Sequence, residues 1–271
     1  NESIRKNYDL AAQGGAASRL YLHAFDEVFA HKDAAAKAAV LRDLVTFWRK
    51  TTPEIKVECI TYVLPELIGI VDIWCPSFTM MDKEYAKYQQ RREAGDELWL
   101  YTCLGSPAPG NPPSFVLESK AIDLRMVGWL CRKFHASGFL YYEISCWKYN
   151  YPKDGRCWPE LPWHPVKEPG YNGEATLIYP ARSWKEEPVS SIRFENLRDG
   201  FEDYDYLTLL EQCWKNGGSS HASAEEKQEV ETILSAGDMV KTAGFYNRDD
   251  RQLRRQRRRI ARLIEKFSNT Q

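Results

Sequence analysis

The sequence predicts an α/β fold of the (β/α)-barrel, or TIM-barrel, type, followed by C-terminal helices. Three observations support this. Strand-like and helix-like segments alternate over residues 18–147, a pattern typical of parallel strands joined by crossover helices. No glycine-rich phosphate loop follows any of the strands, which removes the usual signature of doubly wound nucleotide-binding sheets. Beyond residue 180 the periodicity is almost entirely helical.

Five segments read as strands, because they are rich in aromatic and β-branched residues and are bounded by turn residues. They cover residues 18–25, 55–61, 69–74, 97–104 and 138–147. A complete barrel has eight strands. We therefore expect the chain to hold the C-terminal part of a barrel, with the first strands in a preceding part. The alternative is a partial barrel.

Three helices are predicted between these strands, over residues 33–49, 82–93 and 121–135. In the first of them, Ala36, Val40, Leu44 and Phe47 recur at helical spacing and predict the helix, with Asp33 as its N-cap. After Trp147 comes a loop rich in Trp, Pro and Gly, then a short strand at 175–179 and helices over 190–214, 225–242 and 249–267. We expect residues 1–180 to carry the active site and residues 181–271 to form a helical region packed on the barrel.

The run RRQRRRIARL in the last helix resembles a nucleic-acid-binding patch. The same helix, however, has an apolar stripe of Leu253, Ile260, Leu263, Ile264 and Phe267. This pattern favours the charged outer face of a packed helix. The net charge of −1 also provides no overall field toward nucleic acid.

Other features exclude several classes of protein. Apolar runs are too short to span a bilayer, and the start NESIRKNYDL does not read as a signal peptide, so no compartment is indicated. The seven cysteines form no CxxC pair and none lies near a histidine at zinc spacing, so we expect small buried side chains. No metal or organic cofactor is expected. Aromatic residues make up 13% of the chain, which suits sugar binding as well as core packing.

The candidate catalytic pair is Asp26 and Glu27, which follow the strand at 18–25. Active sites of barrels lie at the carboxyl ends of the strands, where further polar and aromatic residues of this chain gather. The substrate-binding candidates from these strand ends are His23, Trp74, Tyr101, Tyr142, Glu143 and Trp147. For the aromatic residues, core packing is the competing interpretation. For the acidic pair it is an exposed position at a helix start.

Adjacent carboxylates cannot easily straddle a glycosidic bond, as the two acids of most glycosidases do. They suit a substrate-assisted reaction, in which the acetamido oxygen of a 2-acetamido sugar attacks the anomeric carbon. One carboxylate orients the acetamido group and the other transfers the proton. A second hypothesis pairs Glu27 as acid with Glu143 as nucleophile, about 5 Å apart. A third is a non-catalytic carbohydrate-binding barrel.

Five ordered blocks carry a family resemblance: YLHAFDE, VDIWCP, ELWLYTC, DLRMVGWLCRKFHASGFLYYEISCW and SIRFENLRDGFEDYDYLTLLE. Over about residues 15–215 the chain resembles the catalytic domain of glycoside hydrolase family 123. The resemblance implies a β-sandwich followed by a (β/α)8 barrel, and β-N-acetylgalactosaminidase activity on a glycan or glycoconjugate. It also implies that Asp26 stabilises the acetamido group and that Glu27 is the general acid/base.

The resemblance also has two departures. The sandwich and the first barrel strands are not in this sequence, and Tyr142 stands where the family often has Trp. Tyr101 is our candidate for the hydroxyl that completes the acetamido pocket. We expect Arg125 and Trp129 to be structural, and the Arg and Asp residues of the SIRFENLRDGFEDYDYL helix to form ion pairs that dock it to the barrel.

Overall fold

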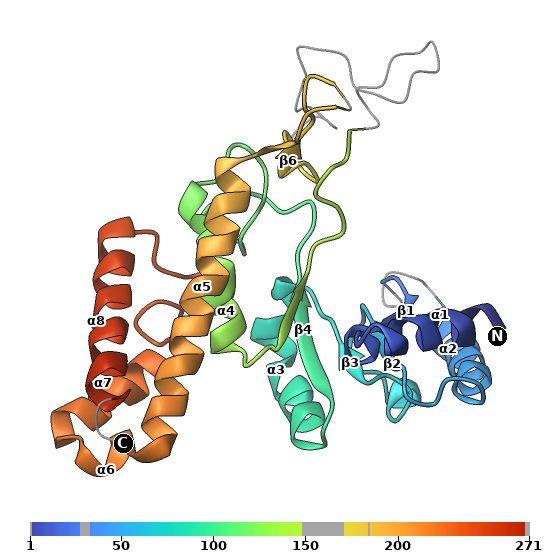
Figure 1. The fold of residues 1–271 in the computed structure, drawn as a ribbon, viewed down its shortest axis with the longest axis horizontal. Coiled ribbons are helices and arrows are strands. Elements are labelled where there is room, and N and C mark those ends of the chain that lie inside the picture. Colours follow the sequence, from blue (N-terminus) through green and yellow to red (C-terminus); the bar gives the residue numbers. More distant parts are fainter. Residues whose placement is uncertain (1, 28–32, 148–170, 184, 269–271) are drawn as a thin grey trace. The chain divides into compact units, whose positions relative to one another are not determined.

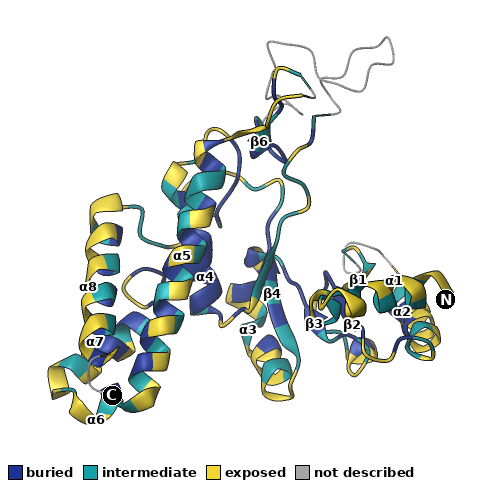
Figure 2. Cartoon of the chain, in the orientation of Figure 1, coloured by how far each residue is buried: buried dark blue, intermediate teal, exposed yellow. Residues whose placement is uncertain are grey.

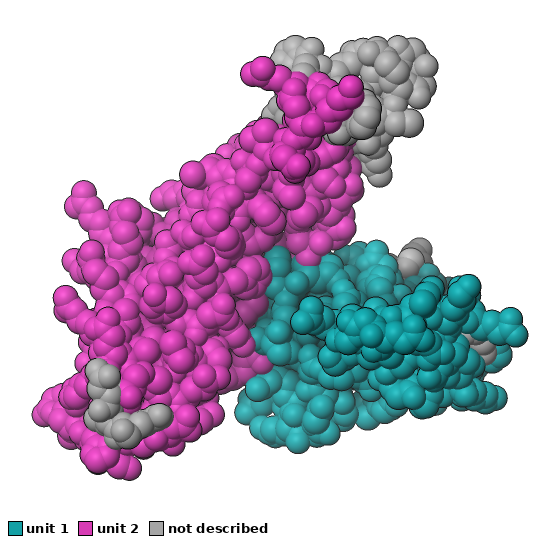
Figure 3. Space-filling model, in the orientation of Figure 1, with its two compact units in different colours: residues 1–101, 136–140 teal, residues 102–135, 141–271 magenta. Residues whose placement is uncertain are grey.

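The computed structural model describes the chain except for residues 1, 28–32, 148–170, 184 and 269–271. The described residues form two compact units (Figure 3). The first contains residues 1–101 and 136–140, and the second contains residues 102–135 and 141–271. The boundary expected near residue 180 falls inside the second unit, and it stays a prediction. Each unit is described by itself below.

The first unit is built on a five-stranded parallel sheet in the order β1-β2-β3-β4-β5 (Figure 1). The strands are β1 Tyr21–Phe25, β2 Lys56–Cys59, β3 Ile73–Trp74, β4 Glu97–Tyr101 and β5 Gly138–Leu140. Each is shorter than the segment expected from the sequence. Their order follows the chain without the reversal that defines a doubly wound sheet. The described fold is therefore mixed α/β with the strand order of a partial barrel.

Three helices belong to this unit: α1 Glu2–Gln13, α2 Ala34–Arg49 and α3 Phe78–Glu93. The sequence did not predict α1. Helix α3 begins four residues earlier than expected, because its first turn is apolar and packs inward through Phe78, Met80 and Met81. Asp33 is the N-cap residue of α2, although its side chain makes no capping hydrogen bond.

Helix α2, which the spacing predicted, buries other residues than the four whose spacing indicated it. Val40, Leu44 and Phe47 are 54%, 39% and 52% exposed. The residues buried instead are Ala38, Leu41 and Val45. Helix α2 carries two apolar stripes, and helical spacing alone does not say which of them meets the sheet.

Strand register separates the sheet into two faces, because side chains of neighbouring paired residues point the same way and alternate along each strand. One face is a buried core formed by Val57, Cys59, Trp74, Leu98 and Leu100. The other, called the polar face below, is formed by Tyr21, His23, Lys56, Glu58, Glu97, Trp99 and Tyr101. Because polar side chains gather on it, the polar face is the candidate surface for a functional site.

In the second unit, α4 Ala121–Lys133 packs closely against α5 Ile192–Cys213, and α4 is buried along most of its length (Figure 2). Glycine makes this approach possible at both helices. A Cβ atom at Gly128 would lie 1.9 Å from the carbonyl oxygen of Gly200, and one at Gly200 would lie 2.4 Å from that of Arg125. No side chain fits at either position without separating the helices.

This unit also contains the hairpin β6 Ile178–Tyr179 with β7 Val189–Ser190, a π-helical turn at Trp214–Gly218, and helices α6 Ser219–His221, α7 Ala224–Leu234 and α8 Asp250–Ser268. Ser191 caps α5 by accepting a hydrogen bond from the Phe194 amide, which confirms one of the two N-caps considered. Helix α7 ends earlier than expected. In α8 the apolar stripe is buried at Leu253, Ile260, Leu263 and Phe267, so the packed-helix interpretation of the basic run is confirmed.

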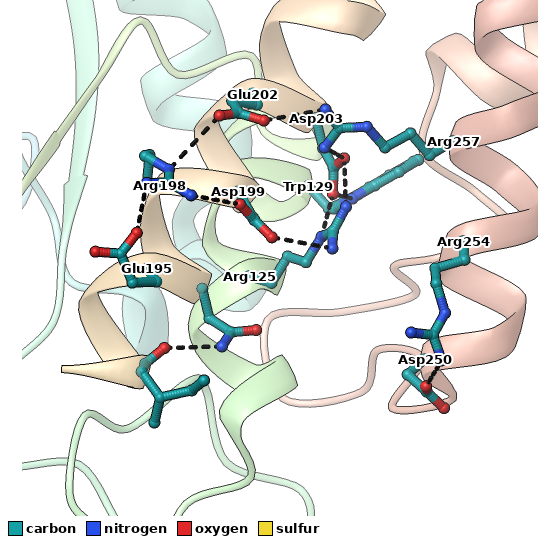
Figure 4. A network of polar contacts seen from close by, with 12 residues as sticks. Arg125, Trp129, Glu195, Arg198, Asp199, Glu202, Asp203, Asp250, Arg254 and Arg257 are labelled. Carbon is teal, nitrogen blue, oxygen red and sulfur yellow. Dashed lines mark hydrogen bonds and ion pairs between the residues drawn. The ribbon is translucent and has the colours of Figure 1, made fainter.

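A buried carboxylate joins three helices of the second unit (Figure 4). Asp203 on α5 accepts hydrogen bonds from Arg125 Nε at 2.7 Å and from Trp129 Nε1 at 3.1 Å, both on α4. It also accepts one from Arg257 of α8 at 2.8 Å. Arg125 and Trp129 therefore make structural contacts, as expected, and ion pairs join α5 to α4 and α8. Docking of this helix to the barrel stays a prediction.

Candidate active site

The acidic pair lies directly after β1, at the carboxyl end of the first strand of the sheet. The pairing of β1 with β2 shifts register between His23 and Phe25, which re-aims the chain just before the pair. Glu27 has a φ of 44°, a left-handed conformation that is uncommon for a residue with a side chain. Asp26 is exposed and Glu27 is half-buried. Two carboxylates therefore stand at the sheet edge where parallel α/β folds place their ligands.

The Glu27 carboxyl group is held by Tyr101 of β4. The phenol hydroxyl donates to Glu27 Oε1 over 2.7 Å, and Tyr101 is 5% exposed. Because its ring is anchored in the sheet, the hydroxyl is a fixed partner for this carboxyl oxygen. The sequence had suggested Tyr101 for the acetamido pocket. The contact described here is with the proposed acid/base itself.

His23 pairs with a buried carboxylate, a contact that the sequence did not reveal. Its Nδ1 lies 2.5 Å from Oε2 of Glu58, the residue opposite it on β2. The His23 side chain is 43% exposed, whereas that of Glu58 is 0% exposed. The hydrogen bond with Glu58 raises the pKa of His23, and the charge of Asp26 adds to this increase. Glu58 stands between Val57 and Cys59 in a strand. A charged residue that alternates with apolar ones was the sequence signal that could have identified it.

Trp74 is placed away from the polar face. Its ring is 1% exposed on the core face of the sheet, and Nε1 donates to Asp96 Oδ2 over 2.7 Å. Arg91 of α3 also binds Asp96. This geometry favours core packing over the predicted role of a substrate wall.

The other three candidates, Tyr142, Glu143 and Trp147, belong to the second unit. Tyr142 is exposed and its ring meets Tyr141 edge-on at 5.2 Å. Trp147 Nε1 donates to the carbonyl of Ile178 over 2.9 Å. The expected separation of Glu27 and Glu143 stays a prediction, as do the substrate roles of all three.

Next to these candidates lies a polar cluster that sequence reasoning missed. The Tyr141 hydroxyl donates to the buried carboxylate of Glu174 over 2.9 Å and accepts from the Ala175 amide at 2.8 Å. Burial raises the pKa of Tyr141 well above its usual range. The phenol is therefore neutral and orders the backbone around Ala175, which has a φ of 60°.

Within the described residues, no three His, Cys, Asp or Glu side chains are grouped so that they hold a metal ion. Five of the six described cysteines are buried, while Cys157 lies outside the described residues. None of the helices in the described ranges is both long enough and apolar enough to cross a membrane.

A parallel sheet in sequential strand order, with two carboxylates at the carboxyl end of its first strand, defines a mixed α/β protein with the strand order of a partial barrel and an acidic candidate site. The family model for the glycoside hydrolase 123 catalytic domain matches residues 19–210. The chain therefore belongs to glycoside hydrolase family 123, as its sequence blocks suggested.

The fold is also similar to a solved structure, a family 123 glycoside hydrolase from Clostridium perfringens whose structural analysis concerns glycolipid glycan hydrolysis. The TM-score is 0.65 and the sequence identity is 20%. The similarity covers 100% of this chain and 45% of that protein, so the chain spans less than half of its length. No curated protein sequence matches this chain.

Proposed function

We propose that this protein is a retaining glycosidase that removes terminal β-linked N-acetylhexosamine by substrate-assisted catalysis, with N-acetylgalactosamine as the preferred sugar. The observation that carries the proposal is the acidic pair. Asp26 and Glu27 are neighbours at one strand end, and Glu27 is tethered through Oε1 to Tyr101. The tethered carboxyl group of Glu27 suits proton transfer, and the exposed carboxylate of Asp26 suits stabilisation of a positive charge.

In the first step the acetamido oxygen of the substrate bonds to the anomeric carbon as the glycosidic bond breaks. Glu27 gives its proton to the leaving oxygen, and an oxazolinium ion forms. The Asp26 carboxylate accepts a hydrogen bond from the acetamido N–H and offsets the positive charge. In the second step Glu27 takes a proton from water, and the water oxygen bonds to the anomeric carbon. The bond between that carbon and the acetamido oxygen breaks, which restores the acetamido group. Two displacements at one carbon retain its configuration.

The Tyr101 hydrogen bond supports the role given to Glu27. A general acid and base must present one oxygen to the reacting group in a fixed direction. With Oε1 engaged by the phenol, Oε2 is the oxygen left to face the substrate. The left-handed backbone of Glu27 is consistent with this, since strained residues cluster where geometry is needed for function.

The preference for N-acetylgalactosamine rests on the family resemblance. We propose a glycan or glycoconjugate as the natural substrate, because the similar enzyme from Clostridium perfringens is described with glycolipid glycans. The acetamido group is the part of the substrate that the proposed chemistry requires.

The test is release of nitrophenol from three β-linked substrates, the N-acetylgalactosaminide, the N-acetylglucosaminide and the plain galactoside. Wild type is compared with Glu27→Gln and Asp26→Asn, each checked for folding by circular dichroism. We expect cleavage of acetamido sugars alone, with kcat reduced by about 100-fold or more in Glu27→Gln because general acid–base catalysis is lost. Glu66→Gln, on an exposed turn, serves as the matched control.

Three results contradict the proposal. Cleavage of the plain galactoside at a similar rate removes the need for an acetamido group. A covalent fluoro-sugar adduct on Glu143 establishes a classical nucleophile. Glycan binding without turnover in wild type, unchanged in Glu27→Gln, indicates a binding protein.

A further inference from the structure

Glu58 belongs to the polar face of the first unit, and its carboxylate is fully buried there. Its carboxylate is 0% exposed, and Oε1 has no hydrogen-bond partner among the described residues. Within the same part of the chain, its one ion-pair partner is His23. A carboxylate removed from water requires a counter-charge and hydrogen bonds close to it. The Glu58–His23 contact supplies both when the imidazole is protonated.

The groups around the pair favour that protonated state. Burial, together with the Glu58 charge, raises the pKa of the Tyr21 phenol and of the Cys59 thiol, so both stay neutral. Cys75, which follows β3, is also buried. Among the described residues, Asp26, three positions further on, also acts on His23, and its charge too favours the cation. Both of these charges are negative, and the Tyr21 and Cys59 side chains are neutral.

We propose that Glu58 is a positioning residue of this site, which holds the His23 imidazole as a fixed, positively charged hydrogen-bond donor to hydroxyl groups of the sugar. The inference rests on the proposed function, because it assigns His23 a partner on the substrate. Glu58 itself does not touch the sugar, since it is fully buried.

The geometry of the imidazole explains how the effect reaches the substrate. Nδ1 is engaged with Glu58 on the buried side of the ring. Nε2 lies on the opposite side of the ring, and the side chain is 43% exposed. When the ring is protonated, Nε2 carries a hydrogen and donates, and it does so near the Asp26–Glu27 pair at the end of the same strand. A charged donor binds a hydroxyl oxygen more strongly than a neutral one.

The first experiment is an NMR titration of the histidine rings. The chain has five histidines, and His23→Gln assigns the signal of His23. We expect Glu58→Gln to lower the pKa of His23, and Glu58→Asp to keep part of the increase because the charge remains. The control is Glu97→Gln on the same face, whose carboxylate pairs with Lys56. A His23 pKa that is unchanged in a folded Glu58→Gln overturns the inference.

The second experiment tests whether Glu58 acts through His23. We expect kcat/KM for the N-acetylgalactosaminide to fall about 10- to 100-fold in Glu58→Gln, the range for one hydrogen bond to a charged group. Most of this loss is expected in KM, because the contact is with a hydroxyl that does not react. Adding Glu58→Gln to His23→Gln should cause no further loss. A full additional loss in the double variant, or unchanged kinetics in Glu58→Gln, overturns the donor role.

The two proposals fail in different ways. The titration needs no substrate, so it decides the link between Glu58 and His23 even if the chain cleaves no sugar. Absence of turnover in a folded wild type contradicts the proposed function, and the donor role fails with it. Turnover with an unchanged His23 titration contradicts this inference and leaves the proposed function standing.

Discussion

At the scale of single residues, several energetically unfavourable features meet at Glu27. Its backbone is left-handed, with a φ of 44°, and it follows a register shift in β1. A neighbouring carboxylate, Asp26, adds like charge. The Tyr101 hydroxyl offsets these costs with a hydrogen bond of 2.7 Å to Glu27 Oε1. Strain that is compensated in this way is typical of residues kept for function.

The Tyr101 hydroxyl can be removed without its ring. We expect Tyr101→Phe to lower kcat by about 10-fold or more, the equivalent of about 1.4 kcal/mol or more, because Glu27 is no longer oriented. The matched control is Tyr88→Phe, whose buried hydroxyl donates to the Thr61 carbonyl at 3.0 Å. That change should lower stability and leave kcat unchanged. Steady-state kinetics with thermal unfolding of both variants distinguishes the effects, and equal kcat values would contradict the role of Tyr101.

At the scale of elements, helices of the second unit are joined by a buried charge and by a close backbone approach. Asp203 is bound by Arg125 and Trp129 of α4 and by Arg257 of α8. Such a network stabilises one arrangement of the three helices, since each donor needs the same carboxylate. Its neighbours on α5 extend it to the surface through Asp199 and Arg198 (Figure 4).

Removing the charge of Asp203 should lower the stability of the protein. We expect Asp203→Asn to lower the free energy of unfolding by about 3 kcal/mol or more, because two guanidinium groups lose their common buried partner. The control is Asp250→Asn, whose i,i+4 pair with Arg254 is exposed and should contribute at most about 0.5 kcal/mol. Urea unfolding of the two variants measures both values. Similar losses in the two variants would show that burial of Asp203 is not the cause.

The crossing of α4 and α5 gives a steric prediction. We expect Gly128→Ala to destabilise the protein by about 3 kcal/mol or more, at or beyond the upper end for an overpacked core, because the new Cβ meets a backbone oxygen at 1.9 Å. Gly14→Ala is the control, since its Cβ finds ordinary contacts at 3.6 Å and beyond. Thermal unfolding compares them. A Gly128→Ala variant as stable as wild type would contradict the close approach.

At the scale of the whole molecule, charge is balanced and locally paired. The net charge is −1, and three cations of α8 pair with acids of other helices: Arg257 with Glu202, Arg259 with Glu229 and Lys266 with Glu226. A nucleic acid would have to compete with these partners. The composition therefore agrees with a protein that binds a neutral ligand such as a sugar.

We accordingly expect no salt-dependent binding of double-stranded DNA at physiological ionic strength. Fluorescence anisotropy of a labelled duplex, titrated with the protein at several salt concentrations, tests this. A basic surface that binds phosphates loses affinity steeply with added salt. Micromolar binding with such a slope would show that the basic outer face of the packed helix α8 binds nucleic acid.

Sequence periodicity and local chemistry determined much of this protein. Alternating strands and helices predicted a parallel sheet, and position after an apolar strand singled out Asp26 and Glu27. The ordered blocks indicated the family, which the match over residues 19–210 bears out. These features depend on residues close together in the chain, so the sequence displays them directly.

Tertiary structure decided which faces and partners are used. In α2 the stripe that contains Leu41 is buried and the stripe that contains Leu44 is exposed, and the ring of Trp74 lies in the core. Tertiary structure also joined Tyr101 to Glu27 across 74 positions of sequence and His23 to Glu58 across 35. Strand pairing and register set these contacts, and register depends on the packing of distant segments rather than on any local pattern.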